Sequence, residues 1–76
     1  MPRHIYEIAA EIHKNWATLS PYAAPYLSAM RQLDTINDMY GCDDARTIIV
    51  YFLSNATGWR GPVAKAIKAE LKGITL

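Results

Sequence analysis

The sequence has one cysteine, Cys42, among its 76 residues, and only two histidines, which lie far apart. A single cysteine forms no disulfide within the chain, and this set of ligands is too small for a structural zinc site. No stretch approaches the ~20 apolar residues of a membrane span. The opening residues MPRHIYEIAAEIHKNW meet a charge every few positions, unlike a signal peptide. We therefore expect a cytoplasmic protein that does not associate with a membrane.

Groups of residues that support catalysis are also missing. The sequence has no glycine-rich phosphate loop, and its serines lack the setting of a nucleophile elbow. His4 and His13 fall on opposite sides of a helix at ~100° per residue, so both are expected to be solvated surface groups. The acidic stretch DTINDMYGCDDA does not have the ligand order of a calcium loop. We expect no enzyme, no metal, no cofactor and no small-molecule substrate.

A chain of 76 residues suffices for one domain, residues 1–76, with one hydrophobic core. A domain of this size buries roughly 60% of the surface that its unfolded chain exposes, so its stability is marginal. The hydrophobic content of 51% favours a globular fold over disorder. Because the core is small, we expect either efficient packing or help from a second copy or a partner.

Four segments carry apolar residues at the three- and four-residue steps of a helix that is buried on one side. They predict an all-α protein, a compact bundle of four short helices joined by short loops. The predicted helices span residues of about 3–18, 25–39, 43–55 and 61–72. The side chains expected to face inward include Ile5, Ile8, Ile12, Trp16, Leu27, Met30, Leu33, Tyr40, Ile48, Ile49, Phe52, Val63, Ala64, Ile67 and Leu71.

Prolines and glycines indicate where the helices begin and end. Pro25 and Pro62 suit the first position of a helix, where the missing N–H has no cost. Gly41 and Gly73 are expected to end the second and fourth helices, because glycine readily takes the left-handed conformation. Trp59 is expected to fold beneath the turn between the third and fourth helices.

The run TIIVYF, residues 47–52, fits either a buried strand or a helix. Asp43 or Asp44 can cap a helix here, and no second strand is apparent for pairing. We therefore predict a helix. Because apolar residues point to nearly every side of this run, we expect it to be the central helix of the bundle.

Positive charge gathers near the end of the chain. Residues 15–58 hold two arginines against four aspartates, whereas residues 59–76 hold four cations against Glu70. The pattern fits a solvated helix face that complements the helix dipoles, or a surface that faces an anion. In the second case a small nucleic-acid-binding regulator would use the basic face of the last helix, with Trp59 stacking on a base. Its contacts would be Arg60, Lys65, Lys68 and Lys72.

Aromatic side chains are numerous for so small a core. Some are expected at the surface, where tyrosine and tryptophan favour protein interfaces. The alternative is that the tyrosines are half-buried with their hydroxyl groups in water. The candidate residues for binding a protein partner, or a second copy of the chain, are Tyr22, Tyr26, Tyr51 and Trp59.

The strings PYLSAM, LDTINDMYGCD and YFLSNATGWRGPVAKAIKAEL resemble a group of small helical proteins encoded on conjugative and phage-like mobile elements of Gram-positive bacteria. The resemblance covers residues of roughly 5–71 and carries no assigned activity. It implies a cytoplasmic accessory protein, such as a regulator or a small inhibitor of host defence, that acts by binding. We expect a non-enzymatic protein-interaction module, with the nucleic-acid-binding regulator as the alternative.

Overall fold

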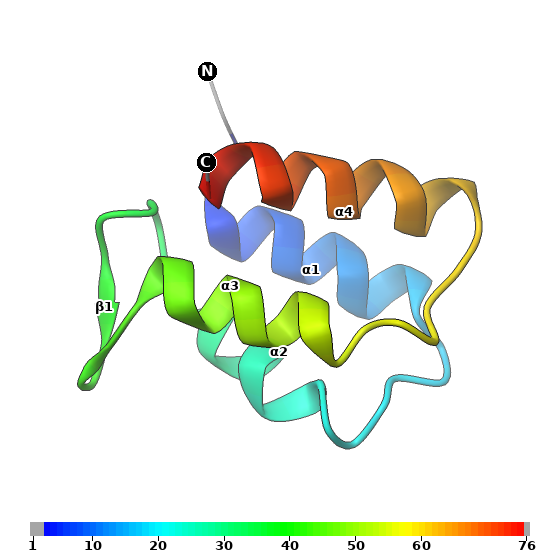
Figure 1. Ribbon diagram of the computed structural model, residues 1–76, viewed down its shortest axis with the longest axis horizontal. Coiled ribbons are helices and arrows are strands. Elements are labelled where there is room, and N and C mark those ends of the chain that lie inside the picture. The colour runs from blue at the N-terminus through cyan, green and yellow to red at the C-terminus, as the bar shows by residue number, and fades with distance from the viewer. Residues whose placement is uncertain (1–2, 76) are drawn as a thin grey trace.

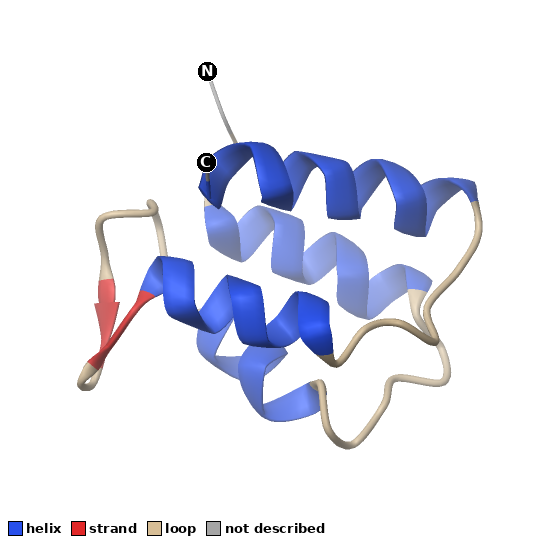
Figure 2. Cartoon of the chain, in the orientation of Figure 1, coloured by secondary structure: helices blue, strands red, loops and turns tan. Residues whose placement is uncertain are grey.

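The computed structural model describes residues 3–75, which form four helices and one small sheet. The helices are α1 (Ile5–Asn15), α2 (Ala24–Met30), α3 (Ala45–Ser54) and α4 (Pro62–Thr75). Strands β1 (Met39–Tyr40) and β2 (Asp43–Asp44) form an antiparallel hairpin between α2 and α3 (Figure 2). The prediction of four helices is confirmed, but the expectation of a purely all-α protein is wrong because of this hairpin.

The helices pack in a ring in which α1 and α3 each contact both α2 and α4. The helices α3 and α4 run in opposite directions, with α1 behind them and α2 below (Figure 1). The third helix is therefore one side of the ring and not its centre, and its outer face is exposed at Val50 and Tyr51. The largest fully buried side chains are Phe52, Ile5, Ile8, Ile12, Met30, Leu33, Ile49 and Leu71.

Helix α1 is shorter at both ends than predicted. Its first N–H groups, on Ile5 and Tyr6, donate to the carbonyl oxygens of Asp34 and Leu33, each over 2.9 Å. These bonds satisfy donors that a helix leaves open at its start. At the other end Trp16 leaves the helical conformation, with φ −113° and ψ 82°, and its side chain is buried. The helix therefore ends at the residue before Trp16.

Helix α2 ends at Met30, well before the predicted limit of residue 39. The segment that follows is rich in poor helix formers, and its own side chains bond the backbone. Asp38 Oδ2 accepts from the N–H groups of Asp34, over 2.7 Å, and Thr35, over 3.0 Å. Because Leu33 and Asp34 also offer their carbonyl oxygens to α1, this segment cannot continue the helix.

The hairpin depends on a glycine that was expected to end a helix. Tyr40 pairs with Asp43, so Gly41 and Cys42 form a two-residue loop. Gly41 has φ 63°, which suits the first central position of a type II′ turn. Asp44 then caps α3, because its Oδ1 accepts from the N–H of Thr47 over 2.7 Å. The prediction that an aspartate caps this helix is confirmed for Asp44.

Helix α4 begins at Pro62, as predicted, and is preceded by Gly61 with φ 114°. The expectation that Gly73 ends this helix is wrong, since α4 continues to Thr75. Ile74 packs against the core, and Arg46 Nε donates to the carbonyl oxygen of Thr75 over 3.0 Å. These contacts outweigh the cost of a glycine near the end of a helix, ~1 kcal/mol relative to alanine.

Two predicted core residues lie at the surface. Tyr40 is 40% exposed because it belongs to the hairpin and not to a helix. Val63 is 42% exposed, whereas Ala64, Ile67 and Leu71 are buried along α4. Val63 lies in the first turn of α4, ~100° from Ala64 and ~80° from Leu71 around the helix, and so falls at the edge of the buried stripe.

Candidate functional site

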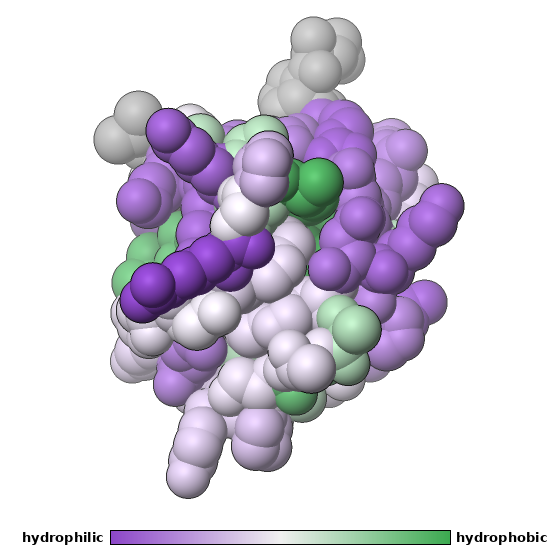
Figure 3. Space-filling model, turned by 90° about the vertical axis from the view of Figure 1, so that its right-hand side faces the viewer, coloured by the Kyte–Doolittle hydropathy of each residue, from purple (hydrophilic) through white to green (hydrophobic). Residues whose placement is uncertain are grey.

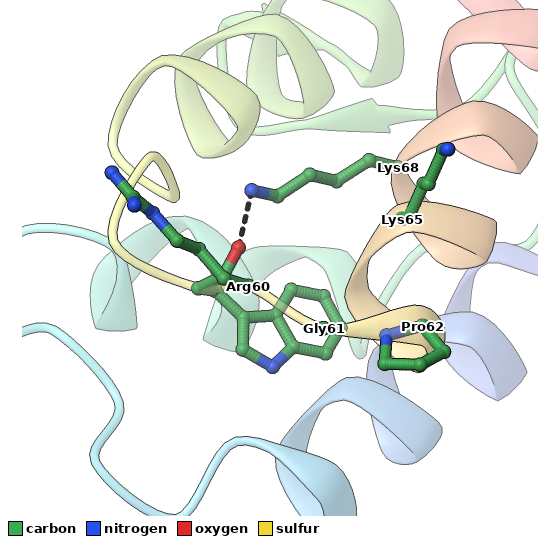
Figure 4. Close-up of a pocket in the computed structure, with 6 residues that line it drawn as sticks. Arg60, Gly61, Pro62, Lys65 and Lys68 are labelled. Atoms are coloured by element: carbon green, nitrogen blue, oxygen red, sulfur yellow. Dashed lines mark hydrogen bonds between the residues drawn. The ribbon is translucent and has the colours of Figure 1, made fainter.

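An open hollow of about 700 Å³ lies against the α3–α4 loop and the first turns of α4 (Figure 4). This end of the molecule shows weakly polar and apolar residues between strongly hydrophilic flanks (Figure 3). Three of the lining residues are basic, and the others are apolar or glycine. The lining residues are Trp59, Arg60, Gly61, Pro62, Lys65 and Lys68.

Trp59 fixes the loop that carries the hollow. Its side chain is only 5% exposed and stacks on Trp16, with ring centroids 5.4 Å apart and planes tilted by 13°. Trp16 also meets Phe52 edge-on, with centroids 6.2 Å apart. Trp59 therefore joins the loop to the end of α1 and to the core, and the expectation that it folds beneath the turn is confirmed. Its burial leaves little of the ring free to stack on a base or to contact a partner.

The basic side chains border the hollow, Arg60 from the loop and both lysines from α4. Arg60 and Lys65 extend to opposite sides, and Lys68 reaches between them toward the loop (Figure 4). Lys68 Nζ donates to the carbonyl oxygen of Trp59 over 2.6 Å. Burial lowers the pKa of Lys68, and the positive charges of Lys72 and Arg60 lower it further. The cations gathered here therefore repel one another.

The one carboxylate of α4, on Glu70, is engaged elsewhere. Arg3 donates to it twice, from Nη2 over 2.6 Å and from Nε over 2.9 Å, and also pairs with Glu11 over 2.7 Å. The hydrogen bonds from Arg3 lower the pKa of Glu70, and both carboxylates raise the pKa of Arg3. Within residues 3–75, no carboxylate pairs with any of the four predicted nucleic-acid contacts, Arg60, Lys65, Lys68 and Lys72.

Lys72 does not line the hollow. It follows Lys68 by one turn of α4, about 6 Å along the helix axis, and is exposed. The spacing in sequence therefore placed three of the four cations around one hollow, and the fourth continues the same face of α4. Sequence reasoning missed Gly61 and Pro62 as lining residues, because a turn that starts a helix gives no sign of the space beside it.

A second candidate site is a tyrosine cluster on α2 and α3. Tyr26 and Tyr51 touch at the surface, with ring centroids 5.6 Å apart and planes tilted by 43°. Tyr22 lies one turn before Tyr26 and is 77% exposed. Tyr51 is 50% exposed, whereas Tyr26 is half-buried. The fold thus brings two of the predicted partner-binding residues into contact, and a third, Tyr22, is exposed on the turn that precedes α2.

The outer face of α3 extends this cluster with uncharged side chains, and the exposed Arg46, one turn before Val50, bonds to Thr75 of α4. Val50 is 46% exposed, and Thr47 and Ser54 lie on the same side of the helix at helical spacing. Ser54 Oγ donates to the carbonyl oxygen of Val50 over 3.0 Å. The sequence shows directly that TIIVYF contains no charged residue. Which of its residues face outward becomes clear only from their burial in the fold.

His4 and Asp34 form a pair that sequence reasoning missed. His4 Nδ1 and Asp34 Oδ1 are in hydrogen-bond contact, and the imidazole stacks on Tyr6 with ring centroids 5.0 Å apart. The pair lines a smaller hollow of about 300 Å³ beside the start of α1. His13, in contrast, is exposed, as expected. The pairing depends on the segment that follows α2, so the sequence pattern of α1 gives no sign of it.

The comparisons with known proteins find no matching family model, no matching curated protein and no matching solved structure. Residues 3–75 contain no group of three or more histidine, cysteine, aspartate or glutamate side chains that could hold a metal ion. Of the helices described, none is both long and apolar enough to cross a bilayer. What supports a function is therefore the geometry of the basic hollow and of the tyrosine cluster.

Proposed function

We propose that this protein is a non-enzymatic interaction module that docks another protein chain on the exposed side of α2 and α3. The observation that carries the proposal is the contact between Tyr26 and Tyr51 at the surface. We name this surface the α2–α3 face, and its residues are Tyr22, Tyr26, Thr47, Val50, Tyr51 and Ser54.

The composition of the α2–α3 face supports protein binding. The centres of protein interfaces are depleted in charge and enriched in tyrosine, tryptophan and other large side chains. The α2–α3 face offers three tyrosines and a valine, with no charged member. Within residues 3–75, the hydroxyl groups of Tyr22, Tyr26 and Tyr51 form no hydrogen bond with another protein group. They remain available to a partner.

The rigidity of the α2–α3 face favours binding as well. The helices position Tyr26 and Tyr51, and the rings restrict each other by contact. Ordering a side chain on binding costs about 0.5–1.5 kcal/mol, and a side chain that is already restricted loses less freedom. Tyrosine also has few rotatable bonds for its contact area. The cluster therefore suits the centre of an interface, with the hydroxyl groups at its rim.

The size of the chain sets how much of it a partner covers. A standard interface buries ~800 Å² on each partner, and the exposed surface of this chain is 4898 Å². One partner would therefore cover roughly one sixth of the surface, which is about one side of the ring of helices. The resemblance to small proteins of mobile elements supports an accessory role in which the partner is a protein of the host, of the element, or a second copy.

Replacing Tyr51 with alanine tests this proposal. We expect Tyr51→Ala to weaken partner binding by at least about fivefold, since tyrosines that dominate an interface contribute more than ~1 kcal/mol. Tyr6→Ala is the matched control, because Tyr6 is 44% exposed, close to the 50% of Tyr51, but lies on α1. Equal loss in the two variants, or no loss in Tyr51→Ala, would contradict the proposal.

Self-association needs its own measurement. Light scattering coupled to size exclusion gives the mass of the protein in solution. A dimer that Tyr51→Ala dissociates would identify the partner as a second copy of the chain. A monomer at high micromolar concentration would exclude the homodimer, and capture from a lysate of the native host with the wild type and both variants would then test for a different partner.

A further inference from the structure

We propose that the basic hollow is a second binding site, which takes a short stretch of a single-stranded nucleic acid. The hollow uses the α3–α4 loop and α4, whereas the α2–α3 face uses other residues, so the two proposals stand separately. The side chains assigned to the phosphates of the strand, one cation to each phosphate, are Arg60, Lys65 and Lys68.

The charges around the hollow are unbalanced. Three cationic side chains line one open space, and no carboxylate of residues 3–75 lines it. Glu70, the acidic residue of α4, is held by Arg3 over 2.6 and 2.9 Å. The first turn of α4 also has no acidic residue, so the positive end of its dipole adds to the same field. An anion in the hollow would relieve this repulsion.

The pKa of Lys68 reflects this repulsion. Its Nζ donates to the carbonyl oxygen of Trp59, which holds the ammonium group beside the loop. The pKa of Lys68 is lowered first by burial and then by Lys72 and Arg60. A bound anion offsets the repulsion from Lys72 and Arg60 and so favours the charged ammonium group, which keeps two N–H donors for a phosphate oxygen.

The lining of the open hollow suits an anion that carries an organic body, because cations and apolar groups lie side by side in it. Gly61, Pro62 and the edge of Trp59 supply an apolar surface beside the cations. A nucleotide unit has both parts, a phosphate for the cations and a sugar and base for the apolar surface.

The basic face of α4 favours a strand over an isolated nucleotide. Lys72 continues from Lys68 by one turn, about 6 Å along the helix, so a chain leaving the hollow meets another cation. Non-specific binding of single strands combines such a basic path with apolar or aromatic surface beside the bases. The net charge of +1 predicts weak, salt-sensitive binding, with a Kd of about 10⁻⁴–10⁻⁶ M.

Fluorescence anisotropy of a labelled oligothymidylate, titrated with the full chain between about 50 and 200 mM salt, tests the inference. Neutralising three phosphates gives a slope of log K against log salt of about −2 for a single strand. Arg60→Gln and Lys65→Gln are each expected to weaken binding about two- to fivefold and to reduce the slope by about 0.7. Both residues are exposed, so the variants are expected to fold. Lys68 is left unchanged because it also holds the loop.

Three controls separate the alternatives. Arg31→Gln removes an exposed cation that follows α2, away from the hollow, and is expected to leave binding unchanged. Tyr51→Ala is also expected to leave it unchanged, which separates this site from the α2–α3 face. A mononucleotide that competes as strongly as the oligonucleotide would overturn the assignment to a strand and give the site to free nucleotides.

The following outcomes would also overturn the inference. The first is no binding at low salt. The second is an Arg31→Gln loss as large as that of Lys65→Gln. The third is a polyglutamate peptide that competes as strongly as the strand, because the site would then recognise negative charge of any kind.

Discussion

Replacing Trp59 with alanine tests how the hollow is held in place. Burial of a tryptophan removes about 150–250 Å² from water, and truncation of a buried aromatic typically costs ~3–5 kcal/mol. Trp59 is 5% exposed and stacked on Trp16, so we expect a loss near the middle of that range. At about 0.05–0.15 kcal/mol per residue, a chain of 76 residues has a total stability of roughly 4–11 kcal/mol. Trp59→Ala is therefore expected to lose between roughly one third and all of the stability of the fold.

Urea unfolding followed by circular dichroism measures this loss. Trp59→Phe keeps an aromatic ring in the same place and is expected to fold with a smaller loss, so the comparison remains informative if Trp59→Ala does not fold. Tyr22→Ala is the control, because Tyr22 is 77% exposed and its truncation should change stability by less than ~0.5 kcal/mol. A loss below ~1 kcal/mol in Trp59→Ala would refute the claim that this stack anchors the loop.

The remaining predictions concern helix caps, glycines and the carboxylates that bond the backbone. Asp44→Ala removes the cap of α3 and should lower the urea midpoint, whereas Asp43→Ala should not. Gly73→Ala should raise the free energy of unfolding by about 0.5–1 kcal/mol, since the helix continues through this position and an added Cβ meets nothing within 4 Å. Gly61→Ala should lower it, because Gly61 has φ 114°. Backbone N–H groups lower the folded-state pKa values of Asp38 and Asp44, so the stability that these carboxylates add is present above their unfolded pKa of ~3.9 and is lost as pH falls below it. Acid titration of the unfolding free energy should show this loss, and Asp44→Asn should reduce it.

The sequence predicted the helices well where one face of each is continuously buried. The stripes of Ile5, Ile8 and Ile12 in α1 and of Ala64 and Ile67 in α4 follow the helical period, so periodicity alone locates these elements. Local chemistry also predicted the start of α4 at a proline and the aspartate cap of α3.

The hairpin was beyond this kind of reasoning. The segment after Met30 still places apolar residues at helical steps, but Asp38 bonds the backbone N–H groups of Asp34 and Thr35 and forms a turn instead. The carbonyl oxygen of Leu33, moreover, bonds the N–H of Tyr6. The conformation of the segment after Met30 is decided by hydrogen bonds of its side chains and by contacts with α1, which is distant in sequence. The hydrophobic periodicity of the segment itself carries no information about these contacts.

The candidate sites were predictable to different extents. The spacing of Lys65 and Lys68 by itself places them on one side of α4, because that spacing is a property of a single helix. The contact between Tyr26 and Tyr51 depends on how α2 packs against α3, so it appears only in the fold.

Photo-crosslinking from position 51 tests the central claim of protein docking most directly. A photoreactive phenylalanine derivative replaces Tyr51 in one variant and Tyr6 in another, two positions of similar exposure on different sides of the molecule. Irradiation in a lysate of the native host is expected to give a discrete adduct from position 51 and none from position 6. Adducts from position 6 alone, or the same adducts from both positions, would contradict a partner that docks on the α2–α3 face.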